Sequence, residues 1–118
     1  MIAQNYRLRR WRVEKILKKG SEAKIGSFII KYGLNKCGFY RFSVVMSRKF
    51  EKTAVSRNKK KRQVYEAIRN NIKEKPKDEA EKRYYDIILI PYKKILTCNY
   101  SKIYQNISDI LKYFNKIL

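Results

Sequence analysis

The sequence contains no histidine, and its acidic residues are few. Without an imidazole, the chain lacks the side chain that metal-free nucleases ordinarily use for acid-base catalysis near neutral pH. Metal-dependent cleavage of a phosphodiester would instead need converging carboxylates, whereas the 10 Asp and Glu residues are scattered or bunched in segment 78–81. We therefore expect no catalytic residue and no metal site on the protein itself.

Cysteine and long apolar runs are also scarce. The two cysteines, Cys37 and Cys98, lie far apart, and without histidine they offer too few ligands for structural zinc, so we expect two reduced thiols. The longest apolar stretch, Ile87 to Pro91, is too short to span a bilayer, so we expect no membrane association through a span. The opening residues MIAQNYRLRRWR lack the apolar core of a secretory signal, which predicts a cytoplasmic protein.

With only 4 glycines and 2 prolines, no low-complexity linker divides the 118 residues, so we expect a single domain over 1–118. A hydrophobic content of 44% is too high for a disordered basic tail. What the chain has in excess is positive charge, with 30 Lys and Arg against 10 acids and a formal net charge of +20. This excess predicts a polyanionic partner, and charge alone leaves nucleic acid and an anionic membrane surface open.

Hydrophobic periodicity predicts three helices and three strands. The helices are expected over 7–19, ending at Gly20; from an N-cap at Ser56 or Asn58 to a point before Pro76; and from Ser101 onward. The strands are expected over 25–33, 40–47 and 84–92. Turn residues between the first two strands favour a hairpin. The order αββαβα predicts an α+β sandwich, a small mainly antiparallel sheet with helices largely on one side.

Alternation in the first predicted strand separates two faces. Phe28, Ile30 and Tyr32 point one way, and Ile29 and Lys31 point the other. In the second strand, Arg41 and Ser43 lie opposite Phe42 and Val44, so they could extend the face of Ile29 and Lys31 into a groove for a nucleic-acid backbone.

The densest positive charge lies in segment 48–62, which holds eight cations and one acid. On the helix that follows, Asn58, Arg62, Tyr65 and Arg69 form one stripe beside the apolar stripe of Val64, Ala67, Ile68 and Ile72. Guanidinium groups bind phosphates bidentately, and a phenol ring can stack on an unpaired base. The same run could also be a solvated face or a nuclear localisation signal.

The segment AVSRNKKKRQVYEAIR resembles the Arg-Asn-Arg signature helix of the bacterial ribonuclease P protein subunit. The family motif follows a strand ending in S-K-K, and here Ser47-Arg48-Lys49 is followed by Ala54-Val55, Arg57-Asn58, Lys61-Arg62 and Glu66-Ala67 at compatible spacing. The resemblance extends along nearly the whole chain, since RLRRWRVEKILKKG is similar to the family's basic first helix and YYDIILIP to its late strand.

The resemblance implies a ribosomal protein S5 domain 2-like fold with a left-handed βαβ crossover, and a role beside a catalytic RNA that removes the 5′ leader of precursor tRNA with Mg²⁺ held through the RNA. The implied partners are ribonuclease P RNA and precursor tRNA, in a 1:1 protein-RNA assembly. Contacts to the catalytic RNA would come from Arg48, Lys49, Arg57, Asn58, Lys59, Lys61, Arg62, Tyr65 and Arg69. A leader-binding cleft between the first helix and the sheet would be bordered by Val13, Leu17, Ile29, Lys31, Arg41 and Ser43.

Two other functions share this composition. A basic ribosomal or other structural RNA-binding protein would show the same charge but would not need a groove opposite the helices. A DNA-binding module would place its basic helix in a major groove, whereas a helix that docks on a sheet and is cationic in its first turns suits phosphates better than base edges.

Overall fold

The computed structural model describes residues 8–35, 40–46, 54–74 and 84–116. Along the chain the elements are α1 (Arg10–Lys19), β1 (Ser21–Ile25), β2 (Phe28–Asn35), β3 (Arg41–Val44), α2 (Ala54–Glu74), β4 (Tyr84–Pro91), the short 3-10 helix η2 (Lys93–Thr97) and α3 (Tyr100–Lys116). The predicted helices and strands occur in the predicted order, except that the strand predicted over 25–33 is divided by a turn at Gly26 and Ser27, and the α+β fold is confirmed. Strand β1 is an addition to the prediction. Helix α2 begins at Ala54, so Ser56 and Asn58 lie inside it and the N-cap prediction is wrong.

The four strands form one sheet in the order β1-β2-β4-β3. Strand β2 pairs antiparallel with β1 and with β4, while β3 pairs parallel with β4. The predicted hairpin of β2 and β3 is therefore wrong, because β4 lies between them. Helix α2 connects the parallel pair β3 and β4, which is the crossover connection that the family resemblance implies; its left hand stays a prediction.

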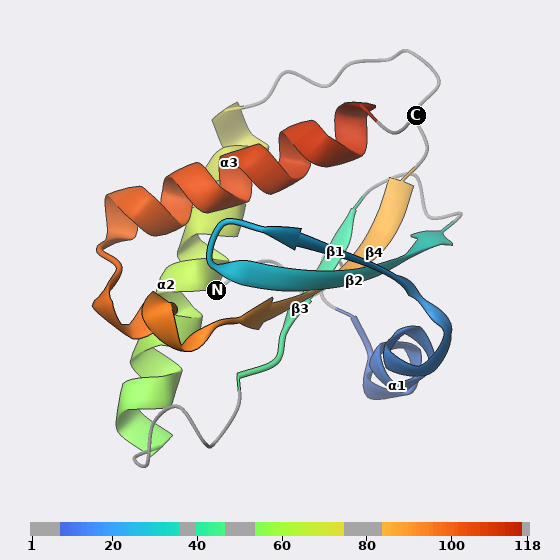
Figure 1. Ribbon diagram of the computed structural model, residues 1–118, viewed down its shortest axis with the longest axis horizontal. Coiled ribbons are helices and arrows are strands. Elements are labelled where there is room, and N and C mark those ends of the chain that lie inside the picture. The colour runs from blue at the N-terminus through green and yellow to red at the C-terminus, as the bar shows by residue number, and fades with distance from the viewer. Residues whose placement is uncertain (1–7, 36–39, 47–53, 75–83, 117–118) are drawn as a thin grey trace.

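One face of the sheet carries the main core. Phe28 and Ile30 of β2, Phe42 of β3 and Ile87 of β4 are buried together with residues of α2 and α3. Helices α2 and α3 both cover this face (Figure 1). The apolar stripe of α3, predicted from its spacing, is buried as expected at Ile103, Ile107, Ile110, Leu111 and Phe114.

Helix α1 packs on the opposite face of the sheet (Figure 1). Its Ile16 is 2% exposed, and Gly33 of β2 lies beneath it. A Cβ at Gly33 would lie 3.4 Å from Nη2 of Arg12 and 3.7 Å from a side-chain carbon of Ile16. The glycine therefore leaves room for the helix to approach the sheet closely.

A two-residue turn, Gly26 and Ser27, joins β1 to β2 and places Ile25 opposite Phe28. Gly26 has a φ of 56°, a conformation in which L side chains are strained. A Cβ there would also lie 2.4 Å from Oδ1 of Asn106 on α3. The Nδ2 of Asn106 donates to the buried Oγ of Ser27 at 2.9 Å, so the turn is held against α3.

Candidate RNA interface

The first turns of α2 project cations from a helix that is anchored further along. Val64, Ala67 and Ile68 are fully buried against the sheet and α3. Before them, the side chains of Asn58, Lys59 and Arg62 are exposed, and those of Arg57 and Lys61 are half-buried. Arg48 and Lys49 lie outside the described residues. The structure thus places five of the residues predicted to contact the catalytic RNA together in the first turns of one helix.

Lys60 differs from its neighbours in the basic run. Its Nζ donates to the carbonyl oxygen of Cys98, just after η2, at 2.7 Å, and to Oε1 of Gln63 at 3.2 Å. The ammonium therefore satisfies a backbone carbonyl after η2 and ties α2 to the segment that leads into α3. Lys60 has a structural contact and was not among the predicted RNA ligands.

Tyr65 does not lie on the exposed stripe. It is 7% exposed and belongs to the core, and its hydroxyl accepts a hydrogen bond of 3.1 Å from the backbone N–H of Val44. The next N–H along the chain, that of Val45, donates to Leu89 of β4, so the N–H of Val44 points to the other side of β3, where Tyr65 accepts its hydrogen bond. The prediction that the Tyr65 ring stacks on an RNA base is therefore wrong.

Arg69, at the far end of the predicted stripe, is paired within its own helix. Its Nη2 contacts Oε1 of Glu66 one turn earlier, and both side chains are about four-tenths exposed. This pairing reduces the net charge that Arg69 offers to a phosphate. The positive part of α2 is concentrated toward Arg57 and Arg62, and contact of Arg69 with RNA stays a prediction.

The predicted leader-binding residues of the sheet share one face, which we call the α1 face and which comprises Ile29, Lys31, Arg41, Ser43 and Asp86. The register places Lys31 opposite Ile88 and Ile29 opposite Ile90 of β4. It also places Ser43 opposite Ile88 on the other side of β4. The predicted alternation of the strands is confirmed, and α1 lies over this face.

Lys31 links the α1 face to α1 itself. Its Nζ donates to the carbonyl oxygen of Leu17 at 3.2 Å and lies 3.9 Å from Oε1 of Glu22 on β1. The carbonyls of the last helical turn have no partner within the helix, and a cation there is favoured by the helix dipole. Val13 and Leu17, the two predicted residues of α1, are half-buried, as Ile29 and Ser43 are.

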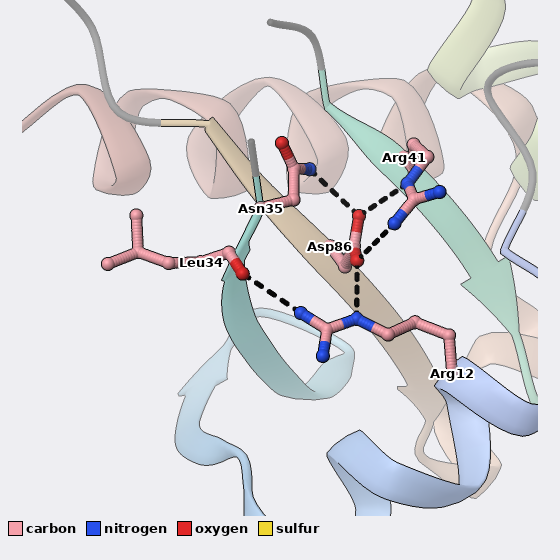
Figure 2. A network of polar contacts seen from close by, with 5 residues as sticks. All are labelled: Arg12, Leu34, Asn35, Arg41 and Asp86. Atoms are coloured by element: carbon pink, nitrogen blue, oxygen red, sulfur yellow. Dashed lines mark hydrogen bonds and ion pairs between the residues drawn. The ribbon is translucent and has the colours of Figure 1, made fainter. Parts of the chain in front are cut away.

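A buried carboxylate organises the other end of this face (Figure 2). Asp86 has no exposed surface. Arg41 donates to both of its oxygens, from Nε to Oδ1 and from Nη2 to Oδ2, each at 2.7 Å. Arg12 of α1 donates from Nε to Oδ2 at 2.6 Å, and Asn35 donates from Nδ2 to Oδ1 at 2.8 Å. We call these four residues the Asp86 cluster.

The electrostatics of the Asp86 cluster favour the ionised carboxylate. Burial acts to raise the pKa of Asp86, but the hydrogen bonds from Arg41, Arg12 and Asn35 outweigh burial and leave the pKa below its ordinary value. Arg12 also donates from Nη2 to the carbonyl oxygen of Leu34 at 2.9 Å, as Figure 2 shows. The cluster therefore fixes α1 and the guanidinium of Arg41 against the sheet.

Arg12 and Asn35 are site residues that sequence reasoning missed. The one available signal was Asp86 itself, an acid in an otherwise apolar strand, which requires buried donors if the strand is central. The predicted groove residue Arg41 is present on the expected face, but its guanidinium is engaged by Asp86, and its side chain is 23% exposed.

Two further properties of the described residues concern metal sites and membrane-spanning helices. Within residues 8–35, 40–46, 54–74 and 84–116, no three His, Cys, Asp or Glu side chains are grouped so that they could hold a metal ion. In those same ranges no helix is long and apolar enough to cross a membrane.

The chain matches the family model Ribonuclease P over residues 2–115. It is 26% identical over 103 residues to the ribonuclease P protein component of Mesoplasma florum, covering 87% of this chain and 88% of that protein. Among solved structures, the ribonuclease P protein from Thermotoga maritima superposes with a TM-score of 0.74 at 29% identity, covering 91% of this chain and 96% of that chain. The protein from Staphylococcus aureus gives a TM-score of 0.67 at 25% identity, covering 92% and 94%.

The family model spans nearly all of the chain, and the solved relatives share its α+β architecture. The chain therefore belongs to the Ribonuclease P family, as a protein component of a ribonuclease that associates with ribonuclease P RNA.

Proposed function

We propose that this chain is the RNA-binding protein subunit of ribonuclease P and acts in tRNA 5′ maturation in the cytoplasm. It binds the catalytic RNA through the first turns of α2 and holds the single-stranded 5′ leader of precursor tRNA at the α1 face. One protein joins one RNA. The holoenzyme removes the leader by Mg²⁺-dependent endonucleolytic hydrolysis.

The observation that carries this proposal is the arrangement of α2. Its apolar side is fully buried at Val64, Ala67 and Ile68, so the exposed Lys59 and Arg62 are presented from a rigid support. Each cation that meets a phosphate displaces condensed counterions from the RNA, which is favourable at low salt. A guanidinium also adds a planar, bidentate contact to phosphate oxygens.

In this proposal the RNA performs the hydrolysis, and Mg²⁺ is bound through the RNA. The sequence has no histidine for proton transfer. The buried carboxylate of the site, Asp86, is fully engaged by guanidinium and amide donors of its own chain. The protein supplies positive charge that lets RNA helices and a precursor tRNA approach each other, and a surface that positions the substrate.

The α1 face supports the second part of the proposal. Val13 and Leu17 of α1 and Ile29 of β2 are half-buried, and the ammonium of Lys31 donates to the backbone carbonyl of Leu17. This combination suits a single strand, since the bases can contact apolar surface while a cation meets the backbone. The Asp86 cluster holds α1 at a fixed position over the sheet, so that the binding face is formed before the leader arrives.

Reconstitution with the cognate ribonuclease P RNA tests the proposal. Cleavage of a precursor tRNA is compared at low Mg²⁺ with and without the protein, and we expect strong stimulation by the protein. No stimulation would favour a structural RNA-binding protein of ribosomal type. Cleavage of precursor tRNA by the purified protein, free of RNA, would contradict the division of roles.

A pair of double variants tests the role of α2. Lys59→Ala with Arg62→Ala removes two exposed cations, and we expect weaker assembly with the RNA and a salt dependence whose log-log slope is smaller by about 2. The matched control is Lys102→Ala with Lys112→Ala, which removes two exposed cations from α3. Equal losses for both double variants would show that only net charge matters. Both should keep their folded circular dichroism, since exposed charges add little to stability.

A further inference from the structure

Helix α1 carries a large apolar ring on the side that faces away from the sheet. Trp11 is 62% exposed, the most exposed large hydrophobic side chain among the described residues. On the other side of the same helix, Ile16 is buried and Arg12 reaches Asp86. At about 100° per residue, Trp11 points roughly 140° away from Ile16 and roughly 100° away from Arg12 around the helix. The ring therefore does not contribute to the core or to the α1 face.

Two cations follow the ring on the same side of the helix. Lys15 and Lys18 follow Trp11 at spacings of four and seven residues, so all three lie along one exposed stripe. The acid nearest to the stripe, Glu14, pairs with Arg10 at 3.5 Å, and both side chains are exposed. The outer surface of α1 thus presents an indole followed by two ammonium groups along the same stripe, with the helix's one carboxylate engaged by a cation.

This combination discriminates between kinds of partner. An interface with another protein, or with a second copy of this chain, would bring lysines into a dry centre, where they are disfavoured. A bilayer surface would need more than one apolar side chain to insert. Proteins bind single-stranded nucleic acid with an aromatic ring on which a base stacks and with cations that contact the neighbouring phosphates, and this stripe supplies both.

We propose that the outer stripe of α1, formed by Trp11, Lys15 and Lys18, binds an unpaired nucleotide of RNA. The base stacks on the exposed face of the indole, and the lysines contact the flanking phosphates. This site lies on the side of helix α1 that points away from the sheet, so it is separate from the α1 face and from the basic turns of α2. The inference rests on the proposed function only for the source of the RNA, which is the catalytic RNA or a precursor tRNA.

The chain offers a direct probe, because Trp11 is its one tryptophan. A single-stranded oligouridylate of twelve nucleotides and a blunt RNA duplex of equal length are titrated against the full chain, and indole fluorescence is recorded. A fluorophore on the RNA reports binding independently. We expect the single strand to quench the indole strongly and the duplex to quench it weakly at equal saturation. Saturated binding of the single strand with unchanged indole emission would overturn the inference.

Variants separate stacking from general charge. Trp11→Ala should weaken binding of the single strand by about 5- to 10-fold, at the lower end of what one stacked base contributes. Trp11→Phe should recover most of the affinity, because a smaller ring still stacks. Leu34→Ala is the matched control, since it truncates another exposed apolar side chain that is 54% exposed, and it should have no effect. Equal affinities of Trp11→Ala and the unmodified chain for the single strand would overturn the inference. It would also be overturned if the unmodified chain sedimented as a dimer and Trp11→Ala as a monomer, because the ring would then bind a second copy of the chain.

The source of the RNA is identified by repeating the titration with ribonuclease P RNA, with leader-bearing precursor tRNA and with mature tRNA. Quenching that depends on the leader assigns the nucleotide to the substrate, whereas quenching by ribonuclease P RNA assigns it to the catalytic RNA. If the proposed function is wrong but the α1 site is real, the protein does not stimulate cleavage at low Mg²⁺, and the oligouridylate still quenches Trp11. Normal stimulation without quenching by any single-stranded RNA would remove the α1 site alone.

Discussion

The Nε of Arg12 on α1 lies 2.6 Å from Oδ2 of Asp86 in β4, and this ion pair joins two elements that are 74 residues apart in the chain. The same carboxylate receives the guanidinium of Arg41 from β3. One buried acid therefore fixes both the helix and the strand that border the proposed leader-binding face. A substitution at Asp86 should alter stability and the geometry of this face together.

Asp86→Asn keeps the shape of the side chain and removes its charge. Arg12 and Arg41 would then lie close together without a counter-ion, although both are partly exposed. We expect the free energy of unfolding to fall by about 2 to 4 kcal/mol, near the range for breaking a buried ion pair. Urea unfolding followed by circular dichroism measures the loss.

The control for this substitution is Asp109→Asn on α3, which removes an exposed carboxylate that accepts from Gln105. It should change the free energy of unfolding by less than about 0.5 kcal/mol. Equal effects at the two positions would show that Asp86 acts through net charge and not through its buried contacts.

The pH dependence follows from the lowered pKa of Asp86. A carboxylate whose pKa is lower in the folded state binds its proton more weakly there than in the unfolded chain. The stabilisation that Asp86 provides is complete at a pH above the pKa of the carboxyl in the unfolded chain, which is about 4. It is lost as the pH falls through the lower pKa of the folded state. The difference in unfolding free energy between the unmodified chain and Asp86→Asn should be constant from pH 7 to pH 5 and shrink below pH 4. A difference that shrinks above pH 5 would contradict the lowered pKa.

Tyr65→Phe tests the corrected position of that ring. Removing the hydroxyl leaves the buried N–H of Val44 without its acceptor. We expect a loss of about 1 to 2 kcal/mol in the free energy of unfolding, with unchanged affinity for ribonuclease P RNA. Tyr92→Phe, at a half-buried tyrosine beside Lys94, is the control and should be nearly neutral. Weaker RNA binding with unaltered stability would restore the base-stacking interpretation of Tyr65.

Gly26→Ala tests the turn that holds β1. The positive φ of Gly26 and the closeness of Asn106 both oppose a Cβ. We expect the free energy of unfolding to fall by about 1 to 3 kcal/mol, measured by urea unfolding. Lys24→Ala, at an exposed position of the same hairpin, should stay within about 0.5 kcal/mol. A neutral Gly26→Ala would show that the turn adopts another conformation in solution.

These sites also show what the sequence could predict. Alternation in β2 assigned Lys31 and Ile30 to opposite faces correctly, because that pattern depends only on neighbouring residues. The pairing of strands depends on segments far apart in the chain, and β4, which begins at Tyr84, lies between β2 and β3, which end at Asn35 and Val44. No local pattern contains that information, so the hairpin prediction was wrong.

Strand β1 was missed and Tyr65 was assigned to the wrong side of its helix for related reasons. β1 is an edge strand, whose sequence SEAKI is mostly polar and exposed, as edge strands often are; the glycine-serine turn after it was the only local signal. Tyr65 lies at the boundary between the polar and apolar stripes of α2, and its contact with Val44 on β3 decides on which side it falls. The basic exposed turns of α2 needed no such information, because charge density in the sequence already predicted them.

Lys31→Glu tests the proposed leader-binding face. The ammonium of Lys31 lies between the end of α1 and Glu22, and a carboxylate there would repel both the helix end and a ribose-phosphate backbone. We expect binding of leader-bearing precursor tRNA to the holoenzyme to weaken by roughly 10-fold. Replacing a positive side chain by a negative one near a phosphate costs about 1 to 2 kcal/mol at moderate screening. Binding of mature tRNA, which has no leader, should be almost unchanged. Lys112→Glu reverses an exposed charge on α3 and should leave the ratio of the two affinities as it is. Equal losses for leader-bearing and mature tRNA would remove Lys31 from the leader-binding face and leave it with a structural role at the end of α1.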